Sequence, residues 1–222
     1  MKKLFTAIRA SDLEMVKQII EKKPELVNCV AKKPPKKDDG QSPLQVALKT
    51  GNTAIVNYLL DMGADVNFIE DETCCNAWRT PVLHDAINCA VMSCRWNIDD
   101  KHMGFKVFST KEKAADALDV LKRMLNMGAD VNALDSYGNS GLNRFALQAK
   151  QILPSYNYAE HREENDRIFT AELHEDLRSV LQALKDAGAD DSYKAPNLGY
   201  SVRKFCGEGS ISILFDEVFG AI

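Results

Sequence analysis

The chain has 222 residues, of which 45% are hydrophobic and 27% are charged, and its formal net charge is −4. This composition is that of a folded globular protein and excludes a disordered chain, and no run approaches the roughly 18 apolar residues of a membrane span. The acidic balance argues against a general nucleic-acid binder.

The charge is unevenly distributed along the chain. Residues 1–37 hold ten Lys or Arg and four Asp or Glu, which gives +6, so the remaining 185 residues carry −10. A basic end on an acidic body could steer an acidic partner towards the protein. The alternative is a solvated helix face followed by a basic loop.

The first eight residues imitate the start of a signal peptide. Arg9 and Asp12 end that apolar run before it reaches the roughly 7–15 residues of a signal core. We therefore expect a cytoplasmic protein with an N-terminal helix pair over residues 4–8 and 12–20. In that compartment the cysteines would be reduced thiols; they are Cys29, Cys74, Cys75, Cys89, Cys94 and Cys206.

One phrase recurs along the chain. Gly-Ala-Asp-Val-Asn at 63–67 returns at 128–132 and, as Gly-Ala-Asp-Asp-Ser, at 188–192. Each copy follows apolar residues at helical spacing, which predicts amphipathic helices ending near 60, 125 and 184. The glycine of each copy would take the left-handed conformation that ends a helix.

Helix starts precede the first two copies. Ser42-Pro43 and Thr80-Pro81 place a hydroxyl at the cap and a proline in the first turn. A leucine and then, three residues later, an alanine follow each start, and the small residue would let two helices approach closely.

These two motifs resemble those of the ankyrin repeat family, whose repeat of about 33 residues begins with T-P-L-H-x-A. The resemblance implies an all-α solenoid of about five helix-turn-helix repeats, forming a single domain over residues 1–222. The repeats would cover residues 1–31, 37–69, 76–134, 135–192 and 193–222, with the first and last as caps.

The spacing departs from the family twice. Pro43 to Gly63 is 20 positions, but Pro81 to Gly128 and Gly141 to Gly188 are each 47, so 27 residues are added in both places. We expect longer helices and two inter-helix insertions, at about 92–112 and 148–169, rather than another repeat, and a solvated helix start at 160–166. Their aromatic residues would either pack on each other or form a binding patch; these are Trp96, Phe105, Phe108, Tyr156, Tyr158 and Phe169.

Two of the turns between repeats, the fingers, are also long. Residues 32–39 extend the first finger, where Pro34-Pro35 between lysine pairs predicts an extended, solvated loop. A nuclear-localisation signal is the weaker interpretation of these lysines. Residues 71–75 extend the second finger.

The resemblance implies partner binding through finger tips and the exposed face of each first helix. The positions that match are Asp38, Asp39, Gln41, Lys49, Thr50, Asn76, Ala77, Trp78, Arg79, Asn88, Ser136, Tyr137, Asn139 and Arg144. Trp78, Arg79 and Tyr137 rank first, because Trp, Tyr and Arg are enriched in binding hot spots. Trp78 stands where the family prefers glycine, so it should strain its turn or have a role there; the alternative is that it covers the second finger.

The sequence predicts no catalytic residue, cofactor or metal. The resemblance implies a structural role for His84, bonding between the turns of adjacent repeats, and Cys89-x4-Cys94 misses zinc spacing. We expect a monomeric, non-catalytic scaffold that binds an unidentified protein, with no small-molecule substrate, nucleic acid or membrane. The alternatives are an enzyme or metal-binding protein using the inserted edge, or a microbial effector or toxin-neutralising binder.

Overall fold

The computed structural model describes residues 1–33, 35–102 and 104–221. Its helices and strands follow one another as α1 (Lys2–Arg9), α2 (Leu13–Lys22), η1 (Pro24–Asn28), η2 (Lys36–Asp38), α3 (Pro43–Thr50), α4 (Thr53–Asp61), α5 (Val82–Met92), β1 (Asn97–Asp100), β2 (Gly104–Val107), α6 (Lys111–Asn126), α7 (Gly141–Ala149), β3 (Tyr156–Asn157), β4 (Arg162–Glu163), α8 (Ala171–Asp186), α9 (Val202–Phe205) and α10 (Ser210–Phe219).

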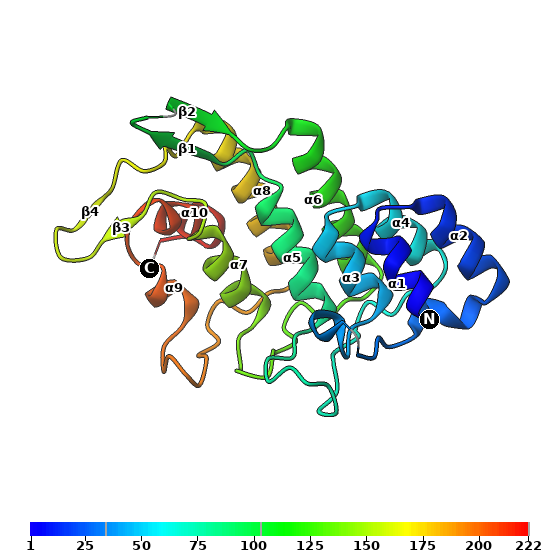
Figure 1. Ribbon diagram of the computed structural model, residues 1–222. Helices are drawn as coiled ribbons and strands as arrows, with labels where there is room; N and C mark the ends of the chain where they lie inside the picture. Colours follow the sequence, from blue (N-terminus) through cyan, green and yellow to red (C-terminus); the bar gives the residue numbers. More distant parts are fainter. Residues whose placement is uncertain (34, 103, 222) are drawn as a thin grey trace.

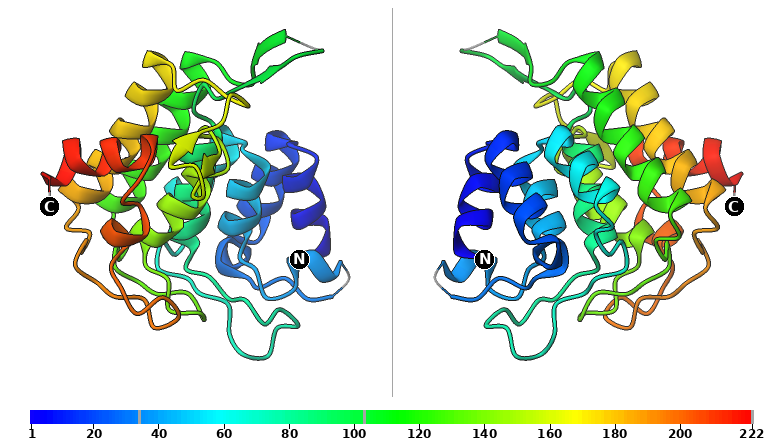
Figure 2. Two further views of the ribbon diagram at one scale, coloured as in Figure 1. Left: turned by 90° about the vertical axis from the view of Figure 1, so that its left-hand side faces the viewer. Right: turned by 90° about the vertical axis from the view of Figure 1, so that its right-hand side faces the viewer.

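The α-helices stack in two layers. In one layer α1, α3, α5, α7 and α9 each contact the next, and in the other α2, α4, α6, α8 and α10 do the same. Figure 1 shows this row from the N-terminus to the C-terminus, and Figure 2 shows the long turns at one end of the helices and the β1–β2 hairpin at the opposite end. The mostly helical architecture agrees with the predicted all-α repeat fold.

Side chains cap several of the helix starts. Ser42 and Gln45 form a reciprocal capping box on α3, and Ser140 and Asn143 form another on α7. The prediction of a hydroxyl cap by Thr80 is wrong, because α5 has no side-chain cap. The Thr80 N–H instead donates to the Glu70 carboxylate at 2.7 Å.

The helix ends explain the recurring phrase. Gly63, Gly128 and Gly188 have φ of 82°, 90° and 87°, which confirms the left-handed turns. Each turn is tied to the preceding one by an asparagine side chain that donates to the glycine carbonyl and accepts from the aspartate N–H. Asn28 makes these bonds to Gly63 and Asp65, and equivalent pairs repeat from Asn67 and Asn132, all at 2.8–3.0 Å.

One continuous core runs between the two layers. Ala47 and Ala86, three residues after Leu44 and Leu83, are fully enclosed, so the first helices pack closely there as the sequence predicts. Ala146 of α7 is enclosed in the same way. Farther along, Phe145 of α7 meets Phe215 of α10 edge to face, with ring centroids 6.1 Å apart. Among the described residues no helix is long and apolar enough to cross a bilayer.

Two short hairpins modify the all-α prediction. β1 pairs with β2 between α5 and α6, and β3 pairs with β4 between α7 and α8. The predicted helix start at 160–166 is wrong: Asn157 accepts from the N–H groups of Ala159 and Glu160, which closes a turn into β4. The two helices that follow the hairpins, α6 and α8, are 16 residues each, against nine in α4.

The segments that contain the hairpins touch each other through polar groups. The Asn97 side chain, fully buried, donates to the Ile168 carbonyl at 2.7 Å and accepts from its N–H at 2.8 Å. Their aromatic rings pair within each segment: Trp96 stacks on Phe108, and Tyr156 meets Tyr158 edge to face. No ring pair joins the two segments in the described part of the chain, so of the two alternatives the aromatic side chains do not pack across the segments ring against ring.

The first finger is less extended than its sequence predicts. Residues 36–38 form the 3₁₀ turn η2, and the Ala31 and Gly40 backbones pair across the base of the loop. Pro34, half of the predicted Pro-Pro pair, lies outside the described residues.

Candidate functional site

A cavity of about 370 Å³ lies between α3 and α5 on the exposed side of the first-helix layer. Its rim includes Lys49, Trp78 and Asn88, and the buried Asp85 forms part of its wall. Four of the predicted binding residues, Lys49, Thr50, Trp78 and Asn88, therefore meet around one hollow, although they come from two helices and a finger.

Trp78 is fixed at this rim by one partner in the next finger and one on α7. Its indole N–H donates to Asp135 at 3.0 Å, and the Arg144 guanidinium lies 4.6 Å from the ring centroid. The ring remains 39% exposed. The predicted backbone strain is wrong, because Trp78 is absent from the residues with positive φ among those described, which apart from glycines are Ser11 and His161.

Asp135 is the polar centre of the second and third fingers. It accepts from the Tyr137 and Asn139 N–H groups and from Trp78, and it pairs with Arg144 at 3.2 Å. Burial opposes its ionisation, but the hydrogen bonds from Asn139 and Trp78 outweigh burial and hold its pKa below the usual value. Asn139 and Arg144 therefore hold the Asp135 carboxylate in place. Tyr137 lies beside them and is 50% exposed.

Several predicted residues join one finger to another. The Arg79 N–H donates to the Ser136 hydroxyl at 3.0 Å, and that hydroxyl donates to the Ala77 carbonyl at 3.1 Å. The Asn76 side chain donates to the Asp39 carbonyl at 3.4 Å. These contacts fix the relative positions of the fingers, so Asn76, Arg79 and Ser136 have a structural role that the sequence did not indicate.

Three predicted contact residues are buried. Asp38 pairs with Arg9, and the Asp39 carboxylate accepts from the Cys75 and Lys33 N–H groups, which lowers the pKa of Asp39. Gln41 lies between them and α3 with 5% exposure. The expectation that Asp38, Asp39 and Gln41 face a partner is therefore corrected: they hold the long first finger against its neighbours.

Asp85 is a carboxyl group almost entirely removed from water. It is 3% exposed, accepts from the Gln45 side chain at 3.3 Å and lies 3.7 Å from the Lys49 ammonium. Burial raises its pKa to about 7, and the Lys49 charge only partly offsets this. The neighbouring His84 has its pKa lowered to about 4, because burial and Arg144 both oppose its protonation.

We predict that Asp85→Asn removes a pH dependence of stability. The folded Asp85 holds its proton up to about pH 7, whereas the unfolded one releases it near 3.8. The contribution of Asp85 to the free energy of unfolding is therefore fully present below pH 3.8. It is lost as the pH rises towards 7, by up to ~1.4 kcal/mol per pH unit. In urea unfolding, the free energy of unfolding of the asparagine variant minus that of the natural protein should rise by more than about 1 kcal/mol between pH 5 and pH 8. An unchanged difference would show that Asp85 is ionised throughout.

His84 connects adjacent turns. Its Nε2 lies 3.1 Å from the Ala133 carbonyl, so the neutral ring donates there, which confirms the predicted structural role. Because His84 titrates with the opposite sign to Asp85, and is present in both proteins of the comparison above, its effect cancels in their difference.

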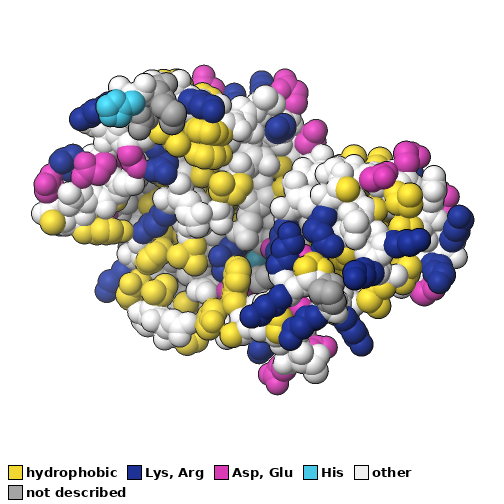
Figure 3. All heavy atoms as spheres, in the orientation of Figure 1, with side chains coloured by type: hydrophobic (Ala, Val, Ile, Leu, Met, Phe, Trp, Pro, Cys, Tyr) yellow, Lys and Arg dark blue, Asp and Glu magenta, His cyan; other side chains and the backbone are white. Residues whose placement is uncertain are grey.

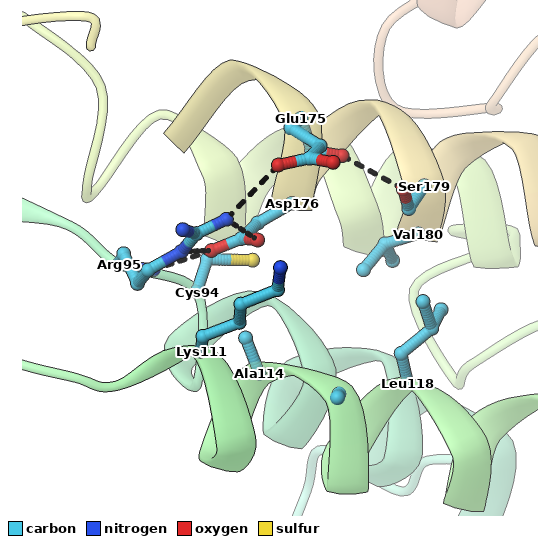
Figure 4. A pocket seen from close by; sticks show the side chains of 10 residues that line it. Cys94, Arg95, Lys111, Ala114, Leu118, Glu175, Asp176, Ser179 and Val180 are labelled. Atoms are coloured by element: carbon cyan, nitrogen blue, oxygen red, sulfur yellow. Dashed lines mark hydrogen bonds and ion pairs between the residues drawn. The ribbon is translucent and has the colours of Figure 1, made fainter. Parts of the chain in front are cut away.

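The opposite edge of the stack holds a smaller hollow of about 120 Å³, shown in Figure 4. Arg95 lines it and binds Asp176 of α8 by donating from Nε at 2.9 Å and from Nη2 at 2.6 Å. The Arg95 N–H also donates to the same carboxylate at 2.9 Å. The inserted edge is therefore fastened by an ion pair, a feature that the sequence analysis missed because the partners are 81 positions apart.

Cysteine and histidine side chains are the groups that the sequence offers as possible zinc ligands. All six cysteines are free, and burial raises the pKa of Cys94 and brings that of Cys206 to about 12. Within residues 1–33, 35–102 and 104–221, no three His, Cys, Asp or Glu side chains are grouped so that they could hold a metal ion.

The paired layers and the asparagine-linked turns define a helical repeat protein. A family model described as ankyrin repeats, in three copies, matches residues 3–96. This part of the chain is similar to ankyrin repeats, which are generally non-catalytic modules of protein–protein interaction. No curated protein matches the chain significantly.

Proposed function

We propose that the protein is a non-catalytic interaction module that binds one protein partner across the exposed side of its first helices and fingers. The contact residues are accessible ones on that side, Lys49, Trp78, Asn88 and Tyr137, and the largely covered Arg144 supports the Trp78 ring. The observation that carries the proposal is the 370 Å³ cavity whose rim includes the half-exposed Trp78, which Asp135 and Arg144 hold in place.

The physical support is preorganisation. A side chain already fixed by a hydrogen bond and a stacked guanidinium loses little further freedom on binding, so more of its contact energy becomes affinity. A fixed Trp side chain beside a hollow, with an exposed Tyr on the neighbouring finger, is the kind of feature from which interface hot spots are built. The hydrogen bonds between neighbouring fingers fix the positions of Trp78 and Tyr137 relative to each other.

The proposal extends to the organisation of the whole chain. We take the five helix pairs as five repeats of one solenoid domain, with the two hairpin segments inserted within the third and fourth. The protein acts as a cytoplasmic monomer, so that the face is open to a partner. Among the described residues, no observation favours the enzyme or metal-binding alternative.

Site-specific crosslinking tests the binding face. A photoreactive amino acid replaces Lys49 at the cavity rim, and a matched variant carries it at Lys122, exposed on α6 of the other layer. After irradiation in lysate of the native cells, we expect one protein to be joined to the Lys49 probe and not to the Lys122 probe. Equal labelling of both probes, or labelling from Lys122 alone, contradicts the proposal.

A further inference from the structure

We propose a second binding surface, at the N-terminal edge of the stack, that takes an acidic peptide segment of a partner carrying one apolar side chain. This basic surface consists of Lys2 and Lys3 of α1 and of Lys32, Lys33, Lys36 and Lys37 in the first finger. It lies apart from the Trp78 cavity, so it does not depend on the proposed partner groove.

The charges of this surface are not neutralised within the protein. All six lysines are exposed, and in the described part of the chain none of them forms an ion pair. The two nearest acidic residues of the finger, Asp38 and Asp39, are buried and already bonded to Arg9 and to backbone N–H groups. Figure 3 shows dark blue side chains gathered at this end of the molecule.

A hollow lies among these lysines. It has a volume of about 230 Å³ between α1 and the first finger, and its lining includes Phe5, Ala31 and Pro35. Lys2, Lys32 and Lys33 stand at its edge. An apolar wall ringed by unpaired ammonium groups fits a segment in which one apolar side chain is flanked by carboxylates.

The finger is built to hold its lysines in place. The Ala31 N–H donates to the Gln41 carbonyl at 2.8 Å, and the Gly40 N–H donates to the Ala31 carbonyl at 2.9 Å. The Lys33 N–H donates to the buried Asp39 carboxylate at 3.0 Å. Ordering the loop therefore costs little when a partner binds.

A peptide suits this surface better than a nucleic acid. The residues beyond position 37 carry −10, which restricts any anionic partner, peptide or nucleic acid, to the length of the basic surface. The apolar lining is aliphatic apart from the enclosed Phe5, so it offers no exposed ring on which a base could stack.

The test uses the full chain and dye-labelled peptides in fluorescence anisotropy. The probe is a 12-residue peptide of Asp and Glu with one central leucine. Three comparison probes are the same peptide with Asn and Gln in place of Asp and Glu, the acidic peptide with Leu→Gly, and a single-stranded oligonucleotide. We expect the acidic probe to bind, with affinity falling as salt rises, and to bind more tightly than the other three.

Charge reversal locates the site. Lys32→Glu with Lys33→Glu should weaken the acidic probe by about tenfold or more, because two attractions become repulsions. Lys113→Glu with Lys122→Glu, the same charge change on exposed positions of α6, should alter it less than about twofold. Tyr137→Ala should leave it unchanged, which separates this surface from the Trp78 cavity.

The contrary results are equally plain. Equal weakening by both charge reversals, no binding of the acidic probe, or tighter binding of the oligonucleotide overturns the proposal. Equal affinity for the leucine and glycine peptides overturns the role given to the hollow.

Discussion

Replacing Arg95 by alanine should lower the free energy of unfolding by about 2–4 kcal/mol, because it leaves the Asp176 carboxylate without its charged partner in a poorly solvated place. The two side chains are 15% and 9% exposed, and three hydrogen bonds join Arg95 to that one carboxylate. The substitution keeps the backbone N–H bond but removes both guanidinium bonds. Urea unfolding followed by circular dichroism measures the loss.

Two further variants make this prediction specific. Arg162→Ala removes an arginine that pairs with Glu160 and Glu164 while half exposed, and it should cost less than about 1 kcal/mol. Arg95→Lys keeps the charge but cannot bind both carboxylate oxygens in one plane, so it should fall between alanine and the natural protein. A loss for Arg95→Ala no larger than that for Arg162→Ala would refute the account of the inserted edge.

The repeated part of the fold could be predicted from the sequence because its signals are local. A capping serine, an amphipathic helix and a terminal glycine each act within a few residues, and they recur. Asn28, Asn67 and Asn132 act at longer range, through side-chain bonds to the following turn that the recurring phrase did not indicate.

The inserted segments could not be predicted in the same way. β1 and β2 are four residues each, too short for an alternating pattern to stand out. What orders them is distant: Asn97 meets Ile168 across 71 positions, and Arg95 meets Asp176 across 81. The spacing of residues within a short segment cannot predict contacts between residues so far apart in the sequence.

The candidate site was predicted in part. Matching positions to a repeat indicates which residues lie near the fingers, but it does not tell exposure from burial. Asp39 was chosen for its place in the turn, whereas its carboxylate faces inward to the Cys75 N–H. Asp85 was overlooked because its environment comes from Gln45 and Lys49 of the preceding helix.

Truncating the exposed aromatic residues of the proposed groove should have the largest effect on function. Tyr137→Ala removes a half-exposed ring while keeping the backbone carbonyl that accepts from Asn197. We expect it to weaken partner binding by about 10- to 100-fold, the range of a hot-spot residue, with the unfolding transition unchanged. Trp78→Ala should weaken binding at least as much and should also cost some stability, since Asp135 and Arg144 lose a partner.

The binding constant of the crosslinked partner tests the central claim most directly. Once that protein is identified and purified, calorimetry compares the natural chain with Tyr137→Ala and with Met127→Ala, which removes a similarly exposed apolar side chain at the end of α6. The account predicts at least about tenfold weaker binding for Tyr137→Ala and a change of less than about twofold for Met127→Ala. Equal affinities for the natural chain and Tyr137→Ala, or a loss confined to Met127→Ala, would contradict it.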